Sequence, residues 1–104
     1  MAKKPEPEKK TATAPTAADA ARMALYGDVG KRIREVREGL GVGQAECARG
    51  AEIDTSSMFR IESGTQNLTI DTLARLSLSL GVPMDDLLSG VEPDPLLVAP
   101  RTRG

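Results

Sequence analysis

Residues 43–64, GQAECARGAEIDTSSMFRIESG, contain two short helical patterns separated by a turn. The first pattern predicts a helix over residues 44–50. We expect its inner side to be narrow enough for another helix to approach closely, because that side carries only small residues: Ala45, Cys47 and Ala48. The single cysteine of the chain is therefore expected to be buried and slow to react with thiol reagents.

The second pattern begins after Asp54, whose carboxylate can cap a helix by accepting hydrogen bonds from the free amides of the first turn. Met58 and Ile61 point inward from this helix, which is expected to end at Ser63 and Gly64. Its first turn carries three hydroxyl side chains and little apolar surface. A helix with so polar a beginning is better suited to binding than to packing.

A longer amphipathic pattern precedes this stretch. Its apolar residues recur at spacings of four, three and four, which places them on one face of a helix: Val29, Ile33, Val36 and Leu40. Asp28 is available as the N-cap, and Gly39 and Gly41 end the pattern.

Two further helices are expected downstream. Thr69 can cap the first of them, whose buried stripe is Ile70, Leu73, Leu76 and Leu80. The second is short; it starts at Pro83, whose fixed backbone suits a first helical position, and ends before Gly90. No segment alternates like a strand. The sequence therefore predicts an all-α domain, a compact five-helix bundle over residues 28–90.

The segments on either side of this domain are expected to be flexible tails. Residues 1–27 begin with a run rich in Lys, Glu, Pro, Thr and Ala and are expected to be mostly disordered, with at most a short helical turn before Gly27. Residues 91–104 contain three prolines, which favour extended backbone. A patch in this second tail can dock on a partner or on the domain itself: Leu96, Leu97 and Val98.

The composition argues against catalysis and metal binding. The chain has 104 residues, no histidine and one cysteine, so the usual zinc sites cannot be assembled and the commonest general base is missing. We expect no catalytic residue, no metal site and no cofactor. No run of about 18 apolar residues and no signal peptide is found, so a cytoplasmic protein that does not enter membranes is expected.

The order of these patterns resembles the phage-repressor-like helix-turn-helix family of the Cro/C1 or XRE type. The resemblance covers about residues 29–88 and runs through GKRIREVRE, VGQAECA, AEID, SSMFRIESG and LTIDTLARLSLSLGVPMDDLL. It implies a fold like the DNA-binding domain of lambda repressor. It also implies that the third helix of the bundle lies in the major groove of double-stranded DNA, while the second crosses the phosphate backbone.

The resemblance assigns base reading to the exposed side of the third helix, with Thr55, Ser56, Phe59 and Arg60. Contacts with the DNA backbone are expected from the first two helices and from the loop after the third: Arg32, Gln44, Arg49, Thr65, Gln66 and Asn67. Arg34 lies at the same edge of the first two helices. Gln44 matches a family position whose amide anchors a phosphate and braces the third helix; a role in helix capping alone is the alternative.

Other matched residues are assigned to structure. Arg37 and Glu62 fit family positions that form a partly buried ion pair between the first and third helices. Three residues depart from the family pattern: Gly43 replaces a Ser or Thr cap, and Gly50 and Glu52 replace commoner residues around the turn, where a glycine is often found at the position of Glu52. Residues 28–90 carry seven basic and ten acidic side chains, a net charge of −3, so DNA binding would depend on where the positive charges lie.

Two functions remain open from the sequence. The favoured one is a sequence-specific transcriptional regulator, a repressor that binds a symmetric operator as a homodimer. Leu87 and Leu88 are its candidate dimer interface, because adjacent residues of one helix cannot both face the same core; one core leucine beside a partly exposed one is the alternative. The second function is a protein-interaction module, such as the antitoxin of a toxin-antitoxin pair, that reaches a protein partner through its tails.

Overall fold

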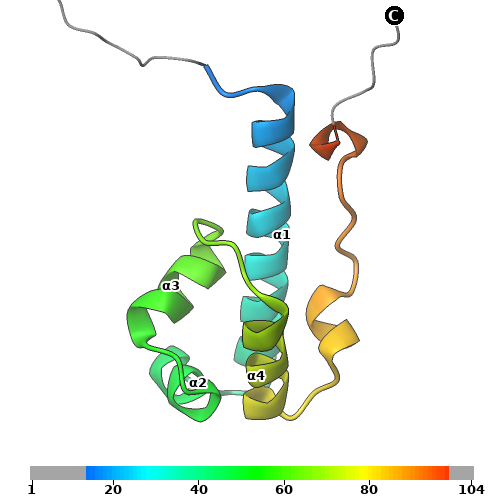
Figure 1. Cartoon of the computed structure of the whole chain (residues 1–104). Coiled ribbons are helices and arrows are strands. Elements are labelled where there is room, and N and C mark those ends of the chain that lie inside the picture. The colour runs from blue at the N-terminus through cyan, green and yellow to red at the C-terminus, as the bar shows by residue number, and fades with distance from the viewer. Residues whose placement is uncertain (1–13, 99–104) are drawn as a thin grey trace, which may run out of the picture.

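The computed structural model describes residues 14–98, and within this range the chain forms four α-helices, two short 3-10 helices and no strand (Figure 1). The elements in order are α1 (Ala17–Gly39), α2 (Gln44–Ala51), α3 (Thr55–Ser63), α4 (Ile70–Leu80), η2 (Met84–Leu88) and η3 (Pro95–Leu97). The expectation of an all-α fold is confirmed. The expected fifth α-helix is instead the 3-10 helix η2, and Pro83 precedes it with extended backbone.

The first helix is longer than its apolar pattern predicts. It begins at Ala17 because Thr16 and Asp19 form a reciprocal capping box: the Thr16 hydroxyl accepts from the Asp19 amide at 3.0 Å, and the Asp19 carboxylate accepts from the Thr16 amide at 3.1 Å. Asp28 is therefore an exposed residue within the helix, not its cap. The expected tail is accordingly helical from Ala17 onward, while residues 1–13 lie outside the described range.

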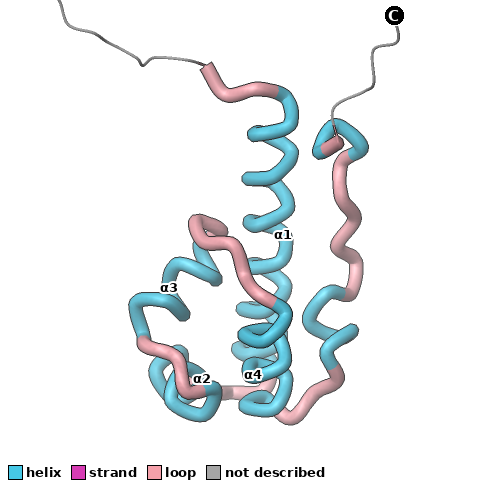
Figure 2. The backbone as a smooth tube through the Cα atoms, in the orientation of Figure 1, coloured by secondary structure: helices cyan, strands magenta, loops and turns pink. Residues whose placement is uncertain are grey.

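The C-terminal segment covers this added length of helix. After η2 the chain runs back along α1 without regular secondary structure, so that η3 lies beside the N-terminal half of α1 (Figure 2). Ala21 is buried in this part of the molecule, Leu97 is half-buried, and Leu96 and Val98 are exposed. The last six residues, 99–104, lie outside the described range.

The core lies where α1, α2, α3, α4 and η2 meet. Its fully buried side chains are Ile33, Cys47, Met58, Ile61, Leu76 and Leu87. The predicted stripe of α4 is buried at Leu73, Leu76 and Leu80, but Ile70, the first residue of the helix, is 75% exposed. Leu40 is 51% exposed, since it follows the last residue of α1 and leaves the apolar face.

The packing of α2 on α4 agrees with a narrow inner side. Cys47, Ala48 and Ala51 are buried there, whereas Ala45, expected inside, is exposed. The hydroxyl of Ser79 donates to the Cys47 carbonyl at 2.8 Å and lies 3.9 Å from its sulfur. Burial raises the pKa of the Cys47 thiol. The expected burial of this cysteine is confirmed.

The position of α3 depends on a close approach to α1. A Cβ atom on Gly30 would overlap the carbonyl oxygen of Ile61, and one on Gly64 would lie 2.6 Å from the Cα of Gly27. Gly64 also ends α3 with a positive φ of 76°. Glycine at these two positions lets the C-terminal half of α3 rest directly on the backbone of α1.

No helix in residues 14–98 is both long and apolar enough to cross a membrane. The same part of the chain contains no group of three or more acidic or cysteine side chains that could hold a metal ion.

Candidate nucleic-acid interface

The first turn of α3 is held by its cap. The Asp54 carboxylate accepts from the Ser57 amide at 2.7 Å and from the Ser56 hydroxyl at 3.0 Å. The hydrogen bond from the Ser57 amide, and then that from Ser56, lowers the pKa of Asp54. The cap predicted for α3 is therefore present, and it fixes the start of the helix that carries the expected base readers.

The two sides of α3 differ in what they contact. Met58, Ile61 and Glu62 are buried against the rest of the domain. The opposite side exposes the four residues that the sequence assigns to base reading: Thr55, Ser56, Phe59 and Arg60. Phe59 is 61% exposed although its ring is the largest apolar group of the helix. The structure thus brings these four side chains together on one exposed helical face.

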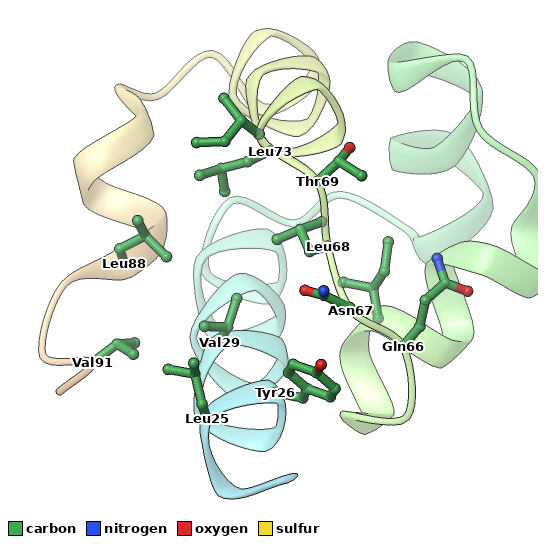
Figure 3. A pocket seen from close by; sticks show the side chains of 12 residues that line it. Leu25, Tyr26, Val29, Gln66, Asn67, Leu68, Thr69, Leu73, Leu88 and Val91 are labelled. Atoms are coloured by element: carbon green, nitrogen blue, oxygen red, sulfur yellow. The ribbon is translucent and has the colours of Figure 1, made fainter. Parts of the chain in front are cut away.

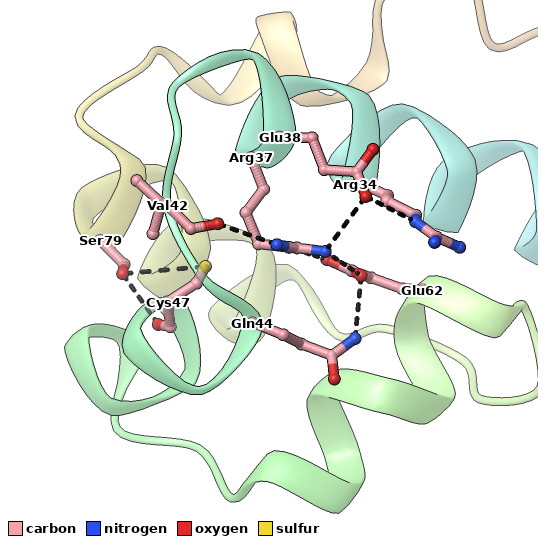
Figure 4. A network of polar contacts seen from close by, with 8 residues as sticks. All are labelled: Arg34, Arg37, Glu38, Val42, Gln44, Cys47, Glu62 and Ser79. Carbon is pink, nitrogen blue, oxygen red and sulfur yellow. Dashed lines mark hydrogen bonds and ion pairs between the residues drawn. The ribbon is translucent and has the colours of Figure 1, made fainter.

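A carboxylate links the three helices behind this face (Figure 4). Arg37 of α1 donates to Glu62 of α3 through Nε at 2.6 Å and through Nη2 at 2.9 Å, and its Nη1 donates to the Val42 carbonyl at 2.8 Å. Gln44 of α2 donates to the same carboxylate at 3.0 Å. The hydrogen bond with Glu62 raises the pKa of Arg37. These bonds fix the relative positions of α1, α2 and α3.

Gln44 also borders a hollow on the outer side of this network. The hollow has a volume of about 170 Å³ and is lined by Arg34, Arg37, Gln44, Phe59, Glu62 and Ser63. Gln44 is the first residue of α2, whose N-cap Gly43 contributes no side-chain hydrogen bond. Arg34 is exposed and paired at 3.1 Å with Glu38, a pair that solvent weakens. Arg34, Gln44 and the exposed ring of Phe59 therefore border the same hollow.

Arg32 does not join this surface. Its Nε donates to the carbonyl oxygen of Asp86 in η2 at 2.7 Å. Successive residues of an α-helix are rotated by about 100°, so Arg32 and Arg34 point to sides of α1 about 200° apart. Arg32 therefore faces η2, on the flank of α1 away from Phe59. This placement separates Arg32 from the other α1 arginine expected at this edge, Arg34.

The other expected backbone contacts lie around the ends of α2 and α3. Arg49 is exposed in the last turn of α2. Thr65, Gln66 and Asn67 form the loop after α3, where the Thr65 amide and hydroxyl both donate to the Arg60 carbonyl, at 3.0 and 3.3 Å. The side chain of Gln66 accepts from Arg60 Nε at 2.8 Å. The sequence contains no periodic signal for this last contact, because it joins residues across the end of a helix.

The two adjacent leucines of η2 have different surroundings. Leu87 is fully buried in the core of its own chain, so it cannot lie at a dimer interface, and that expectation is wrong. Leu88 is 39% exposed. It borders an apolar groove of about 300 Å³ between α1, the loop before α4 and η2 (Figure 3). Leu25, Val29 and Val91 also line this groove.

Two short helices joined by a tight turn, the second with a buried and an exposed polar face, define a helix-turn-helix domain. The model of a family described as a helix-turn-helix domain matches residues 30–93, and the chain belongs to this family. The resemblance to the XRE type is thereby confirmed.

Comparison with known proteins gives relatives that are named as regulators or controllers. The chain is 34% identical over 62 residues to the HTH-type transcriptional regulator DdrOP3 of Deinococcus deserti, a match that covers 60% of this chain and 48% of that protein. The chain thus spans about half the length of this curated relative.

Solved structures that resemble this chain are also those of regulators and controllers. The restriction-modification controller protein C.AhdI from Aeromonas hydrophila is 26% identical, with a TM-score of 0.60 over 62% of this chain and 97% of that one. The clp gene regulator ClgR from Corynebacterium glutamicum is 25% identical, with a TM-score of 0.60 over 62% of this chain and 68% of that one.

Proposed function

We propose that this protein is a sequence-specific DNA-binding transcriptional regulator, a repressor that places α3 in the major groove of a symmetric operator. The observation that carries the proposal is the exposed face of α3, where Phe59 and the polar side chains around it contact no core. A solvated helix gains nothing from an exposed phenyl ring, whereas a ring in the major groove can contact a thymine methyl group. The named regulators among the relatives support the same function.

Each side chain on this face suits a base edge. The hydroxyls of Thr55 and Ser56 can donate to or accept from any base pair, and the Arg60 guanidinium can donate two parallel hydrogen bonds to the O6 and N7 atoms of guanine. The link through Glu62 holds α3 at a fixed angle to α2, so these groups enter the groove as one rigid unit.

Phosphate contacts come from the hollow beside α3. The N-terminus of α2 favours an anion. The side chains of Gln44 and Arg34, which line the hollow, supply hydrogen-bond donors for a phosphate there. Arg34 takes the role that was expected of Arg32, because Arg32 is held on the other flank of α1. Arg49, Thr65 and Asn67 extend the contacts to the edges of the site.

Base reading and phosphate binding separate experimentally. Replacing Arg60 by Ala should cost about 1–3 kcal/mol on the cognate operator and relax the preference at one base pair per half-site. Arg34→Ala should weaken binding to cognate and random DNA alike, and reduce the slope of the salt dependence by about one unit. The measurement is fluorescence anisotropy at several salt concentrations, on an operator selected from random DNA.

Arg32→Ala is the matched comparison for Arg34→Ala, since it removes the same charge from the other flank of α1 and should change DNA affinity less. Circular dichroism establishes that each variant is folded. If Arg60→Ala discriminates between sequences as the wild type does, α3 is not the reader. If Arg32→Ala weakens binding as much as Arg34→Ala, the placement of the phosphate contacts is wrong.

The operator is bound by two copies of the chain. Leu88 and the groove beside it supply apolar surface for a second copy, on the side of α1 that also carries Leu25 and Val29. Leu88→Asp should therefore lower the fraction of dimer in sedimentation at micromolar concentration. Leu40→Asp, at the far end of α1, is the control and should leave that fraction unchanged. A wild-type protein that sediments as a monomer, both free and on a symmetric site, contradicts the dimer.

A protein partner is the second candidate function, and one observation favours it. Leu96 and Val98 are exposed on the C-terminal segment, although they are apolar and neighbour the half-buried Leu97. An antitoxin that binds its toxin through this segment would bury them. Loss of a co-purified partner on replacement of both residues by Ser, with DNA binding intact, would support this function.

A further inference from the structure

The side chain of Arg60 is held in one orientation, although it lies on an exposed helical face. Its Nε donates to the side-chain carbonyl of Gln66 at 2.8 Å, and its Nη2 lies 3.5 Å from the Ser57 hydroxyl. A free arginine side chain loses considerable conformational entropy when it is ordered against DNA. In this protein part of that ordering is already present before DNA is bound.

The contact with Gln66 selects one edge of the guanidinium. The group carries five N–H donors on a rigid plane, and it can form paired hydrogen bonds either through Nε and one Nη or through its two Nη atoms. Gln66 occupies the Nε donor. The end of the side chain, with both Nη atoms, is therefore the edge left for a bidentate contact.

Gln66 is itself positioned by the residue that it contacts. The chain turns at Gly64, and the amide and hydroxyl of Thr65 both donate to the main-chain carbonyl of Arg60. Ser63 and Thr65 also share a hydrogen bond at 3.3 Å between their hydroxyls. The loop is thus attached to the main chain of Arg60 at one point and to its side chain at another.

We propose that Gln66 is a positioning residue for sequence recognition: its side-chain carbonyl holds Arg60 so that the two Nη atoms face the DNA bases. This inference rests on the proposed function, in which Arg60 reads a base. It differs from the expectation that Gln66 contacts a phosphate, because a phosphate contact uses the amide nitrogen of Gln66 and does not involve Arg60.

Gln66→Met tests the role, because methionine has nearly the same length and shape but lacks the carbonyl acceptor. The readout is base preference, the ratio of the Kd on an operator with one base pair replaced to the Kd on the cognate operator, measured by anisotropy. Arg60→Ala should lower this ratio about 5- to 150-fold at one base pair. Gln66→Met should lower it about 2- to 10-fold at that same base pair, since Arg60 must then be ordered on binding.

Two further variants distinguish positioning from a direct contact. Gln66→Glu keeps an acceptor for Arg60 and should retain the base preference, even though its negative charge weakens binding to every DNA. The double variant with Arg60→Ala and Gln66→Met should show the same preference as Arg60→Ala alone, because Gln66 acts through Arg60. In the free protein, NMR exchange of the Arg60 Nε proton should be faster in Gln66→Met than in the wild type.

The possible failures are distinguishable. If Arg60→Ala leaves the preference intact, the proposed reader is wrong and the role of Gln66 falls with it. If Arg60→Ala lowers the preference but Gln66→Met weakens all operators equally, or the two effects add, Gln66 contacts phosphate and only this inference is overturned. Unchanged exchange of the Nε proton in Gln66→Met also overturns it.

Discussion

Glu52 is the residue at which the turn between α2 and α3 departs from the glycine expected there. It adopts the left-handed conformation, with φ 58° and ψ 44°, and its amide donates to the carbonyls of Ala48 and Arg49. It is the only non-glycine residue with positive φ in the described part of the chain. The carboxylate lies 3.8 Å from Arg75 but is exposed, so this pair offsets little of the backbone strain.

Glu52→Gly should raise the free energy of unfolding by about 0.5–1 kcal/mol. Glycine removes the steric cost of the left-handed backbone, which exceeds the added entropy of the unfolded chain. Glu52→Ala is the control, because it removes the same carboxylate and keeps the strain. Urea denaturation of both variants is the measurement. An alanine variant as stable as the glycine variant would mean that the side chain, not the backbone, limits stability here.

The packing of α3 on α1 is determined by close contacts between the backbones of the two helices. Gly30 meets the carbonyls of Ile61 and Glu62, and Gly64 meets the backbone at Gly27. The ion pair of Arg37 with Glu62 lies next to this contact and joins the same two helices. Since the carboxylate is buried, its charge is compensated only while α1 stays in place. The orientation of α3 relative to the rest of the domain therefore depends on its packing against α1.

Gly30→Ala should destabilise the domain by about 2–3 kcal/mol or more, since its Cβ meets backbone atoms that cannot move aside. Gly27→Ala is a matched change one turn earlier on the same helix. Its Cβ would meet nothing within 4 Å, and alanine is the better helix former, so this variant should be more stable by about 0.5–1 kcal/mol. Urea denaturation measures both. Equal effects of the two variants would exclude the close approach of α3 to α1.

For the molecule as a whole, Cys47 reports on global opening. It lies in the core between α2 and α4 and is fully buried, and burial raises the pKa of its thiol, so both access and the thiolate fraction are low. Its side chain belongs to the core that α1, α2, α3, α4 and η2 share, so we expect that movement of a single loop does not uncover it. Reaction of this thiol requires the helices to separate.

Labelling of Cys47 by a thiol reagent in native buffer should be slow and should follow global stability. A variant that loses 1.4 kcal/mol of stability should label about ten times faster when opening is a rapid equilibrium. Gly30→Ala should therefore accelerate labelling and Gly27→Ala should slow it. Labelling of the wild type at the rate of a free thiol would show that α2 does not pack on α4 as described.

Much of the fold was predictable from chemistry between close neighbours in the chain. The caps Asp54 and Thr69, and the glycine that ends α3, act within four residues, so the sequence predicts them without knowledge of the rest of the molecule. The start of α1 was predictable in the same way, from the pair Thr16 and Asp19, but the apolar pattern further along indicated a later start.

The candidate site was predictable only in part. The exposed residues of α3 follow from the periodicity of one helix, since Met58 and Ile61 mark the opposite side. The flank of α1 on which Arg32 lies follows from the same periodicity, but its contact with η2 follows from the tertiary position of η2, which the sequence of α1 does not contain. The contact of Arg60 with Gln66 likewise depends on the path of the loop after the helix.

The sequence by itself determined the number and order of the α-helices within residues 28–80, because capping and periodicity involve residues at most one or two turns apart. Only the tertiary structure decided which apolar residues are buried and which polar side chains share a surface. Leu87 and Ile70 show the reason: both fit an apolar pattern, but one meets the core and the other extends past it. Burial depends on which elements from elsewhere in the chain pack against a residue, and a local sequence pattern does not contain this information.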